Sequence, residues 1–402
     1  MVHLEMTRLE FLEKYGKADE PFICGSCGNC TLVCPVFREL KWESYGPRGK
    51  LHIIRSILDG EGKFGKDFAD KIFLCNLCEH CTHVCTTDIS LDRFWEAARA
   101  EVRNRGLLPA PAEFVLKSVK ERGNTLWMSQ MDRLLWTQGV EDLVEGHILK
   151  KAKVAYFLGC NVSLKSQLHD IARSMVKIMD YANVDYTLLG DKEVCCGAPL
   201  VWAGDLKDID EMTKKNLEII QGLGVETVVF SCPSCIQTWK QYSNFLDKNY
   251  DIELLTSSQF ILRLIREKRL SFEAQPMITT TYHDPCIAAR VLKLTEEPRE
   301  IINNIPGVFH VEMSPSRQDT RCCGSHGLLN VVDPILSSRI AERRLRDVSV
   351  TPATRLVTEC PQCILAFDLA KFTTDYDIQV QDITQLVAGA LSPKDEEGDK
   401  DH

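Results

Sequence analysis

The sequence predicts a multidomain α+β protein, with a helical N-terminal module followed by two copies of an α/β domain. Two observations support this fold class. All 18 cysteines fall into two kinds of cluster. From about residue 150, strand-like and helix-like segments alternate in a pattern that recurs with an offset of 126 to 128 residues. Such alternation predicts, in each copy, a mostly parallel sheet with helices packed on it.

The composition argues against several classes of protein. A formal net charge of −9 disfavours a nucleic-acid-binding protein, which needs a basic face. No run of about 18 apolar residues is present, so we expect no membrane span. The first 17 residues mix charged and apolar side chains and do not resemble a signal peptide. We therefore expect a cytoplasmic protein whose cysteines serve metal or redox chemistry rather than disulfides.

The first kind of cysteine cluster is the run C-x2-C-x2-C-x3-C, which occurs twice. It is typical of bacterial ferredoxins, in which three cysteines bind one [4Fe–4S] cube and the fourth binds the other cube. Zinc prefers four ligands, often as two C-x2-C pairs, so a third cysteine at the same interval disfavours zinc. Thr86 stands where a proline is expected after the second run. We assign one cube to Cys24, Cys27, Cys30 and Cys85, and the other to Cys75, Cys78, Cys81 and Cys34.

The spacer between the two runs, residues 36–74, is longer than a compact ferredoxin hairpin needs. It has helical periodicity, with Leu51, Ile54, Ile57 and Leu58 on one face. Two glycines then interrupt the pattern. The module is therefore predicted to be all-helical.

The second kind of cluster contains five cysteines and also occurs twice. A single cysteine is followed after 34 or 35 residues by a Cys-Cys-Gly, and after 35 or 36 more by a C-x-x-C. Adjacent cysteines make poor disulfide partners, which points to another use of these sulfurs. Zinc would leave one thiolate spare in each set, and a thioredoxin-like dithiol would not need three further cysteines. The two sets are Cys160, Cys195, Cys196, Cys232 and Cys235, then Cys286, Cys322, Cys323, Cys360 and Cys363.

The elements of the duplicated domain are predicted from the first copy. We expect each C-x-x-C to open a helix, whose N-terminal amides favour an anionic group. Cys160, Cys232, Cys286 and Cys360 follow strands, so both sets should lie at the carboxyl ends of the sheets. The expected strands are 153–159, 185–190 and 226–232, and the expected helices are 163–184 and 206–224, with closing amphipathic helices at 254–265 and 380–391.

These motifs resemble the CCG-domain iron–sulfur oxidoreductases, and most of all the fused HdrD type found in heterodisulfide reductase. The resemblance covers residues ~20 to ~390. It implies an N-terminal all-helical two-cluster ferredoxin module, then two duplicated α/β CCG domains related by a pseudo-twofold axis. It also implies that each complete set of five cysteines holds a noncubane [4Fe–4S] cluster. The expected cofactors are therefore two cubane and two noncubane [4Fe–4S] clusters, with all 18 cysteines as ligands.

The expected domain boundaries follow the motifs. The expected divisions are 1–105 for the ferredoxin module with its lead-in helix, 106–150 for a helical linker, 151–270 and 271–391 for the two CCG domains, and 392–402 for an acidic disordered tail.

Three residues near the second set are candidates for catalysis. A disulfide reductase must deliver two electrons and about two protons, and histidine is a natural proton donor near neutral pH. His283 and Arg290 flank Cys286, and His326 follows Cys323. The alternative is that His283 and Arg290 only hydrogen-bond the loop and offset cluster charge. His326 departs from the small residue that relatives usually carry there.

Two interpretations of the function remain open at this point. In the first, the chain is an oxidoreductase subunit that passes electrons from the cubes to the noncubane pair and cleaves a disulfide there. In the second, it is a non-catalytic electron-transfer subunit of a flavin-, quinone- or bifurcation-linked complex, for example one feeding benzoyl-CoA reductase. Ile287 stands where a second histidine is expected, and this difference leaves the second interpretation open.

Both interpretations require partners, because the sequence shows no flavin or dinucleotide fingerprint. The expected partners are other redox subunits: a flavin-containing HdrA-like protein, a b-type cytochrome or a dehydrogenase. A disulfide or thiol is the expected small-molecule substrate, and no nucleic acid is expected. Any attachment to the inner membrane should be peripheral and through a partner.

Overall fold

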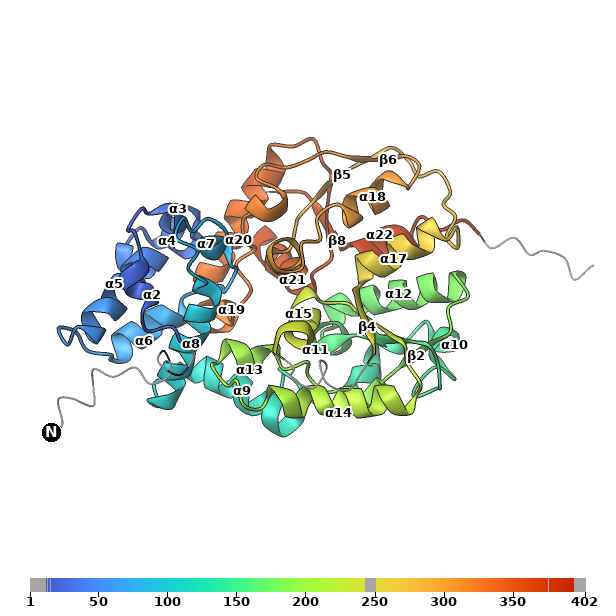
Figure 1. Ribbon diagram of the computed structural model, residues 1–402. Coiled ribbons are helices and arrows are strands. Elements are labelled where there is room, and N and C mark those ends of the chain that lie inside the picture. The colour runs from blue at the N-terminus through green and yellow to red at the C-terminus, as the bar shows by residue number, and fades with distance from the viewer. Residues whose placement is uncertain (1–11, 13, 15, 243–250, 375, 394–402) are drawn as a thin grey trace, which may run out of the picture.

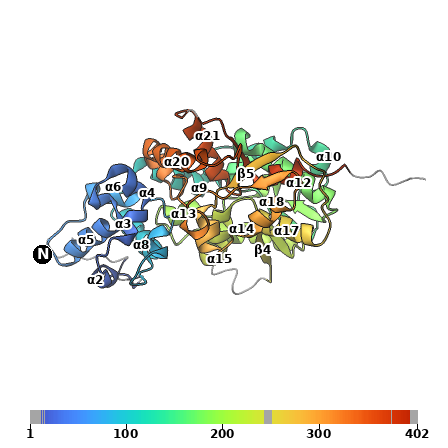
Figure 2. The same ribbon diagram turned by 90° about the horizontal axis from the view of Figure 1, so that it is seen from above.

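The computed structural model describes residues 12, 14, 16–242, 251–374 and 376–393. The N-terminal part is all-helical, as predicted, and lies at one end of the molecule (Figure 1; from above, Figure 2). Most of the predicted lead-in helix, and most of the predicted acidic tail, fall outside the described residues. The helices of this part are α2 (Glu20–Ile23), α3 (Asn29–Val33), α4 (Pro35–Leu40), η1 (Glu43–Tyr45), α5 (Pro47–Leu58), α6 (Lys66–Phe73), α7 (His80–His83) and α8 (Leu91–Asn104).

The spacer between the ferredoxin-type runs folds as its periodicity predicts. In α5, Leu51, Ile54 and Ile57 are buried, and the helix ends at Leu58 before the two glycines. Pro47 sits in the first turn of α5, where its missing N–H has no helical partner to lose. The spacer thus forms the apolar core on which the cysteine loops are mounted.

The segment after this module packs on the first α/β domain. Its helices are α9 (Ala110–Arg122), η2 (Gln130–Thr137) and α10 (Glu141–Val144). Ile148 forms a parallel bridge with Leu188, which extends the edge of the first sheet. Residues predicted as a linker therefore contribute to the wall of the first domain.

The first α/β domain contains a four-stranded parallel sheet in the order β2-β1-β3-β4. Three of its strands lie within the predicted ranges. The fourth strand is absent from the prediction, because its four residues also fit the start of the closing helix; Thr256 ends this strand and caps the helix that follows. Its elements are β1 (Val154–Phe157), α11 (Gly159–Leu164), η3 (Ser166–Leu168), α12 (His169–Tyr181), β2 (Tyr186–Leu188), η4 (Gly190–Lys192), α13 (Ala198–Trp202), α14 (Ile209–Gly222), β3 (Thr227–Phe230), α15 (Pro233–Tyr242), β4 (Glu253–Thr256) and α17 (Ser257–Arg266).

The second α/β domain repeats this topology, with a parallel sheet in the order β6-β5-β7-β8. Here too the predicted closing helix begins with a strand, and Asp382 caps the helix after it. Its elements are β5 (Ile278–Tyr282), η5 (Ile287–Val291), α18 (Glu297–Asn303), β6 (Val308–His310), η6 (Arg317–Asp319), α19 (Leu329–Val332), α20 (Pro334–Ser349), β7 (Arg355–Thr358), α21 (Pro361–Lys371), β8 (Gln379–Asp382) and α22 (Ile383–Ala388).

The contacts between the two copies are reciprocal. Where an element of one copy contacts an element of the other, the counterparts of these two elements also contact each other. Helix α12 of the first copy contacts α22 of the second, and their counterparts α18 and α17 contact each other in the same way. Likewise α11 contacts α21, while η5 contacts α15. Such reciprocal pairing is what a twofold relation requires of an interface. Figure 1 shows α12, α17, α18 and α22 stacked between the two copies.

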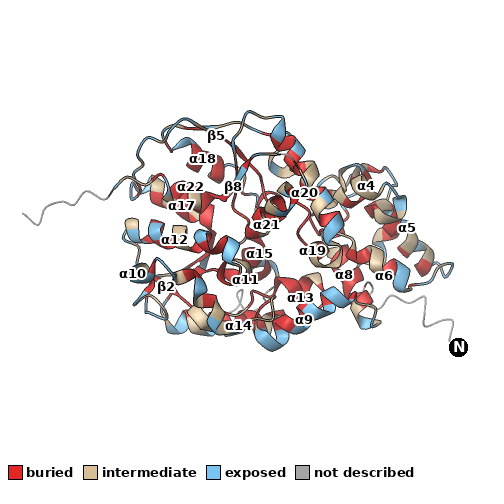
Figure 3. Ribbon diagram, turned by 180° about the vertical axis from the view of Figure 1, so that it is seen from behind, coloured by how far each residue is buried: buried red, intermediate tan, exposed pale blue. Residues whose placement is uncertain are grey.

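One continuous apolar core joins the helical module to the first copy, and a second joins the two copies. Phe94 and Trp95 of α8 belong to the same buried cluster as Phe157 and Trp239 of the first copy. The second cluster contains Tyr156 and residues from both sheets. Figure 3 shows buried residues gathered on the inward faces of α11, α15 and α21. These shared cores fix the position of the helical module on the duplicated pair.

Candidate functional site

The first ferredoxin-type set lies at the outer end of the helical module. Cys30 is buried at the start of α3, whereas Cys27 is exposed. The Sγ of Cys27 lies 3.5 Å from the hydroxyl of Thr86, so the loop after Cys85 runs beside the first run. The pKa of Cys30 is raised by burial, and the nearby charges of Cys24 and Cys27 raise it further. The structure thus brings the loop carrying the fourth cysteine of one run to the first three of the other.

The second ferredoxin-type set lines an internal cavity of the helical module. Cys34, Cys75, Cys78 and Cys81 all contribute to its wall, which also includes Trp95. Burial raises the pKa of Cys34 to about 12. Four thiol side chains that surround an apolar space fit the requirements of a [4Fe–4S] cube.

A buried lysine lies beside this cavity. Lys50 is 3% exposed, and its Nζ donates to the carbonyl of Leu74 over 2.9 Å. Burial lowers its pKa, while the neighbouring charges of Cys75 and Cys34 raise it. A cation in this place offsets the negative charge that thiolate ligands bring into the core. The sequence carried no signal for this role.

The five cysteines of the first copy gather at the carboxyl end of its sheet, as predicted. Cys160 lies in α11 just after β1, and Cys232 precedes α15 just after β3. Hydrogen bonds to Cys195 and Cys235 lower the pKa of Cys196 to about 6. Gly197, next to the Cys-Cys pair, has φ +94°, a conformation that favours glycine and turns the chain into α13.

The second copy gathers its five cysteines in the same way. The side chain of Cys322 interacts with those of Cys286 and Cys323, and the side chain of Cys323 interacts with that of Cys363. Helix α21 begins at Pro361, directly after Cys360. The prediction that each C-x-x-C opens a helix is confirmed in both copies.

Hydrogen bonds between sulfurs also connect the separate sets. A hydrogen bond to Cys322 lowers the pKa of Cys78 to about 6, so the helical module meets the second copy through two cysteines. The side chain of Cys232 of the first copy interacts with that of Cys360 of the second. The thiols therefore form a continuous series from the cavity of the helical module, through the second copy, into the first.

Arg290 fastens the helical module to the second copy. It is 4% exposed, and all three of its guanidinium nitrogens donate to backbone carbonyls. Its Nη1 donates to the carbonyl of Cys78 over 2.8 Å, and its other donors reach Gln318 and Thr320. These contacts hold the loop that carries Cys78 against Cys322. They match the interpretation of Arg290 as a structural residue; its predicted catalytic role stays a prediction.

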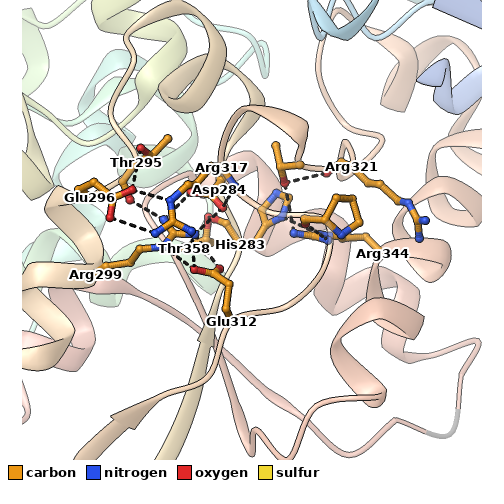
Figure 4. Close-up of polar contacts among 12 residues, drawn as sticks. His283, Asp284, Thr295, Glu296, Arg299, Glu312, Arg317, Arg321, Arg344 and Thr358 are labelled. Carbon is orange, nitrogen blue, oxygen red and sulfur yellow. Dashed lines mark hydrogen bonds and ion pairs between the residues drawn. The ribbon is translucent and has the colours of Figure 1, made fainter. Parts of the chain in front are cut away.

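His283 is buried beside the second set. Arg344 donates from Nε to His283 Nδ1 over 3.2 Å, which leaves the ring proton on Nε2 (Figure 4). A ring nitrogen of His283 lies within 4.8 Å of the sulfurs of Cys323 and Cys363. Burial lowers the pKa of His283, so the ring is neutral near pH 7, and its Nε2 makes no hydrogen bond among the described residues.

An ion-pair network holds the loop that carries His283. Asp284 is fully buried and accepts two hydrogen bonds from Arg299, at 2.7 and 2.9 Å. Arg299 also pairs with Glu312, and the backbone N–H of Arg317 donates to Asp284 (Figure 4). The bidentate geometry fixes the loop between β5 and Cys286.

His326 lies in a different place, at the contact with the helical module. Its Nδ1 lies 2.8 Å from the carbonyl of Asn76, which can only accept, so the proton is on Nδ1. Its ring packs edge-on against Trp202, with centroids 4.6 Å apart. Burial lowers its pKa. The two candidate histidines therefore have different surroundings, with His326 beside Asn76 of the helical module and His283 beside Arg344.

A pocket of about 320 Å³ opens between the two copies. Neither histidine lines it. Lys165 and Gln167 of the first copy face Ser325 and Gln362 of the second across it. Gln362 accepts a hydrogen bond from Asn161 over 2.7 Å, which ties the two copies together at the floor of this region. We call this the inter-repeat pocket.

Comparison with known proteins agrees with this geometry. The family description "4Fe-4S dicluster domain" matches residues 22–89, and "Cysteine-rich domain" matches residues 154–239 and 280–368. The fold and the cysteine sets thus define an iron–sulfur oxidoreductase subunit that holds [4Fe–4S] clusters.

The chain belongs to the HdrD family of heterodisulfide reductase subunits. It is 30% identical to the HdrD subunit of dihydromethanophenazine:CoB–CoM heterodisulfide reductase from Methanosarcina barkeri, over 92% of this chain and 93% of that protein. The same subunit of Methanosarcina acetivorans is 29% identical over the same shares. A subunit of fumarate reductase (CoM/CoB) from Methanothermobacter marburgensis is 24% identical, over 92% of this chain and 72% of that protein. In the described part of the chain, no helix is long and apolar enough to cross a membrane.

Some residues of the site carried no signal in the sequence. Lys50, Arg99, Arg133 and Arg344 lie in helices whose patterns mark only an apolar face. Arg99 is fully buried, and it donates to carbonyls of Cys75, Trp202 and Gly327 from three parts of the chain. Such roles depend on which helices meet, so only the packing reveals them.

Proposed function

We propose that the chain carries electrons from two cubane [4Fe–4S] clusters to two noncubane [4Fe–4S] clusters and uses them to reduce a disulfide to thiols. When bound, the clusters supply one-electron transfer, and the cysteines of the chain fix where each cluster would lie. The continuous series of sulfur contacts from Cys78 to Cys322, and on through Cys360 to Cys232, carries this proposal. This series of neighbouring cysteines ends between the two complete five-cysteine sets. A small molecule bound there can receive both electrons.

The outer end of the helical module is the proposed point of electron entry. Cys27 is exposed there, and the exposed apolar residues Leu32 and Trp42, at 65% and 71%, follow in the same part of the module. An exposed ligand beside apolar surface suits a protein that docks and delivers electrons. The proposed partner is another redox subunit: a flavin-containing HdrA-like protein, a b-type cytochrome or a dehydrogenase.

The inter-repeat pocket is the proposed substrate site, and the duplication supports this choice. A twofold-related pair of domains forms two equivalent grooves. Gln237 and Thr238 of the first copy are the counterparts of Leu365 and Ala366, which line the inter-repeat pocket. Around Gln237, however, the helical module covers the groove, and Gln237 donates to Glu79 over 3.2 Å. One groove thus receives the electron-entry module, and the other is left for a ligand.

The inter-repeat pocket lies beside the second five-cysteine set and is connected to the first through Lys165, although no cysteine is among its lining residues. Ser325 follows Cys323 by two residues, and Gln362 lies in α21 directly before Cys363. Lys165 lies on the opposite wall. Burial lowers its pKa, and a smaller electrostatic effect of Cys160 raises it. A disulfide seated here would lie between the two sets. Its reduction consumes two electrons and two protons and yields two thiols.

The test is a spectroscopic titration of the anaerobically prepared chain with a panel of coenzyme thiols. We expect at least one thiol to change the electron paramagnetic resonance spectrum of the oxidised protein. Ser338→Trp, which fills the pocket, should abolish the change. Ile335→Trp, on the same helix but 73% exposed and outside the pocket, is the matched control and should preserve it. An unchanged spectrum with every thiol would contradict the proposal.

A second candidate is an electron-transfer subunit with no organic substrate. The observation that favours it is the placement of His283 and His326. Both are buried with their own partners, and neither lines the inter-repeat pocket. If no thiol perturbs the spectrum while electrons still pass at full rate to a partner protein, this candidate replaces the first.

A further inference from the structure

Arg133 reaches a cysteine of the first copy from outside the duplicated region. It lies in η2, is 1% exposed, and donates from Nη2 to the Sγ of Cys160 over 3.3 Å. Its Nη1 donates to Ser163 over 3.0 Å and to Glu193 over 2.8 Å. A buried guanidinium is thus aimed at one sulfur of the first five-cysteine set.

Glu193 fixes the direction of this arginine. Its carboxylate accepts the backbone N–H groups of Leu158 and Gly159, at 2.9 and 2.8 Å, and is 2% exposed. The carboxylate of Glu193 therefore binds the backbone directly before Cys160, and a guanidinium N–H of Arg133 donates to the Sγ of Cys160. Hydrogen bonds with a charged donor are about twice as strong as neutral ones.

The second copy has no equivalent of this contact among the described residues. Only residues 267–277 separate it from the first copy, so no segment corresponds to η2. Arg290, near Cys286, uses its nitrogens on backbone carbonyls. Arg344 donates to the ring of His283 and to no sulfur of its set, and in the first copy Phe157 stands at the position that corresponds to His283. A sulfur of the first set thus accepts a hydrogen bond from a guanidinium, whereas an imidazole ring stands between the second set and Arg344.

Building on the clusters proposed above, we propose that Arg133 raises the reduction potential of the cluster in the first copy above that of the cluster in the second. Reduction adds negative charge to a cluster, and a charged donor at a ligand sulfur stabilises the reduced state more than a neutral one does. Electrons that arrive through Cys78 and Cys322 then come to rest on the first copy. Arg133 is in this sense a positioning residue that sets the direction of flow.

The test compares redox titrations of the full chain with all its iron, followed by electron paramagnetic resonance. Cys235→Ser and Cys363→Ser assign the signals to the first and second copies. Arg133→Gln should make reduction of the first-copy cluster about tenfold less favourable, which is about 59 mV for one electron. Glu193→Gln removes the opposing charge and should shift the same signal in the opposite direction. Arg344→Gln is the control, and it should move only the second-copy signal.

Opposite shifts from Arg133→Gln and Glu193→Gln would support the inference, because a purely structural role predicts no such pair of signs. Should Arg133→Gln lose its cluster, the upward shift from Glu193→Gln still decides the matter. Unchanged first-copy potentials in variants with full iron would overturn the inference and leave the proposed function intact. An unaltered chain that holds about two clusters instead of four would overturn both.

Discussion

The side chains of Cys232 and Cys360, the corresponding cysteines of the two copies, interact with each other across the interface between them. The contact lowers the pKa of Cys232, together with a larger effect from Cys235. Each five-cysteine set therefore meets the other through its C-x-x-C motif. This relationship places the two proposed noncubane clusters next to each other.

The first prediction concerns metal content. If all 18 cysteines bind as assigned, the anaerobically prepared chain contains about sixteen irons in four clusters. Iron and zinc should be measured by elemental analysis beside the protein concentration. Eight irons with zinc in the duplicated domains would contradict the assignment.

The second prediction separates the point of entry from the rest of the route. Cys27→Ser removes a ligand from the exposed set and should slow reduction of the chain by an external protein donor. The signals of the duplicated domains should persist, because Cys27 is exposed, whereas nine of the ten cysteines of those domains are buried. Spectroscopy after chemical reduction measures this directly. Collapse of all signals would show that the helical module and the duplicated domains depend on each other.

The third prediction concerns the contact between the helical module and the second copy. Arg290→Met leaves three carbonyls without their donor in a buried place, which costs on the order of 3 kcal/mol or more. We expect a loosened loop around Cys78 and slower electron transfer from the cubes to the second copy, with iron retained. Rapid-mixing reduction followed by freeze-quench spectroscopy measures the rate.

Arg93→Met is a control for this variant, since Arg93 is an arginine of the helical module that donates to the side chains of Glu96 and Gln241 rather than to the carbonyl of Cys78. It packs over Tyr242 at 4.4 Å and pairs with Glu96. Equal rates in Arg290→Met and the unaltered chain would contradict the role of Arg290 in holding the loop.

The fourth prediction concerns pH and stability. Burial raises the pKa of Glu96 to about 7, while its contacts with Arg93 and Tyr242 oppose the rise. A carboxyl whose pKa is higher in the folded state binds more protons there, so the free energy of unfolding falls as the pH rises from about 4.5 to about 7. The loss is on the order of 3 kcal/mol.

Thermal unfolding of the anaerobic protein between pH 5 and pH 8 measures this effect. Glu96→Gln keeps the shape of the side chain and removes the titration, so its curve should be flatter than that of the unaltered chain. Glu101→Gln, in the same helix, is the control. Identical pH dependence in the Glu96 variant and the unaltered chain would show that another group is responsible.

Sequence patterns were sufficient to predict the fold class, the duplication and the position of each C-x-x-C between a strand and a helix. These features are local or periodic: a strand followed by a C-x-x-C specifies where the sulfurs lie on a parallel sheet, and a helix-period pattern specifies α5. The fourth strand of each sheet could not be predicted in this way. Its four residues directly precede the closing helix, and so short a segment is equally compatible with a strand or with the first turn of that helix. The boundary between them is set by the caps Thr256 and Asp382.

Tertiary packing alone establishes which sulfurs meet and which charged side chains approach them. The contacts between Cys78 and Cys322, and between Arg133 and Cys160, join residues far apart in the chain. No spacing rule encodes them, since they depend on how two packed domains and a helical module orient on one another. The same holds for the inter-repeat pocket and for the separation of His283 from His326, because a buried polar side chain takes whichever partner the packing brings to it.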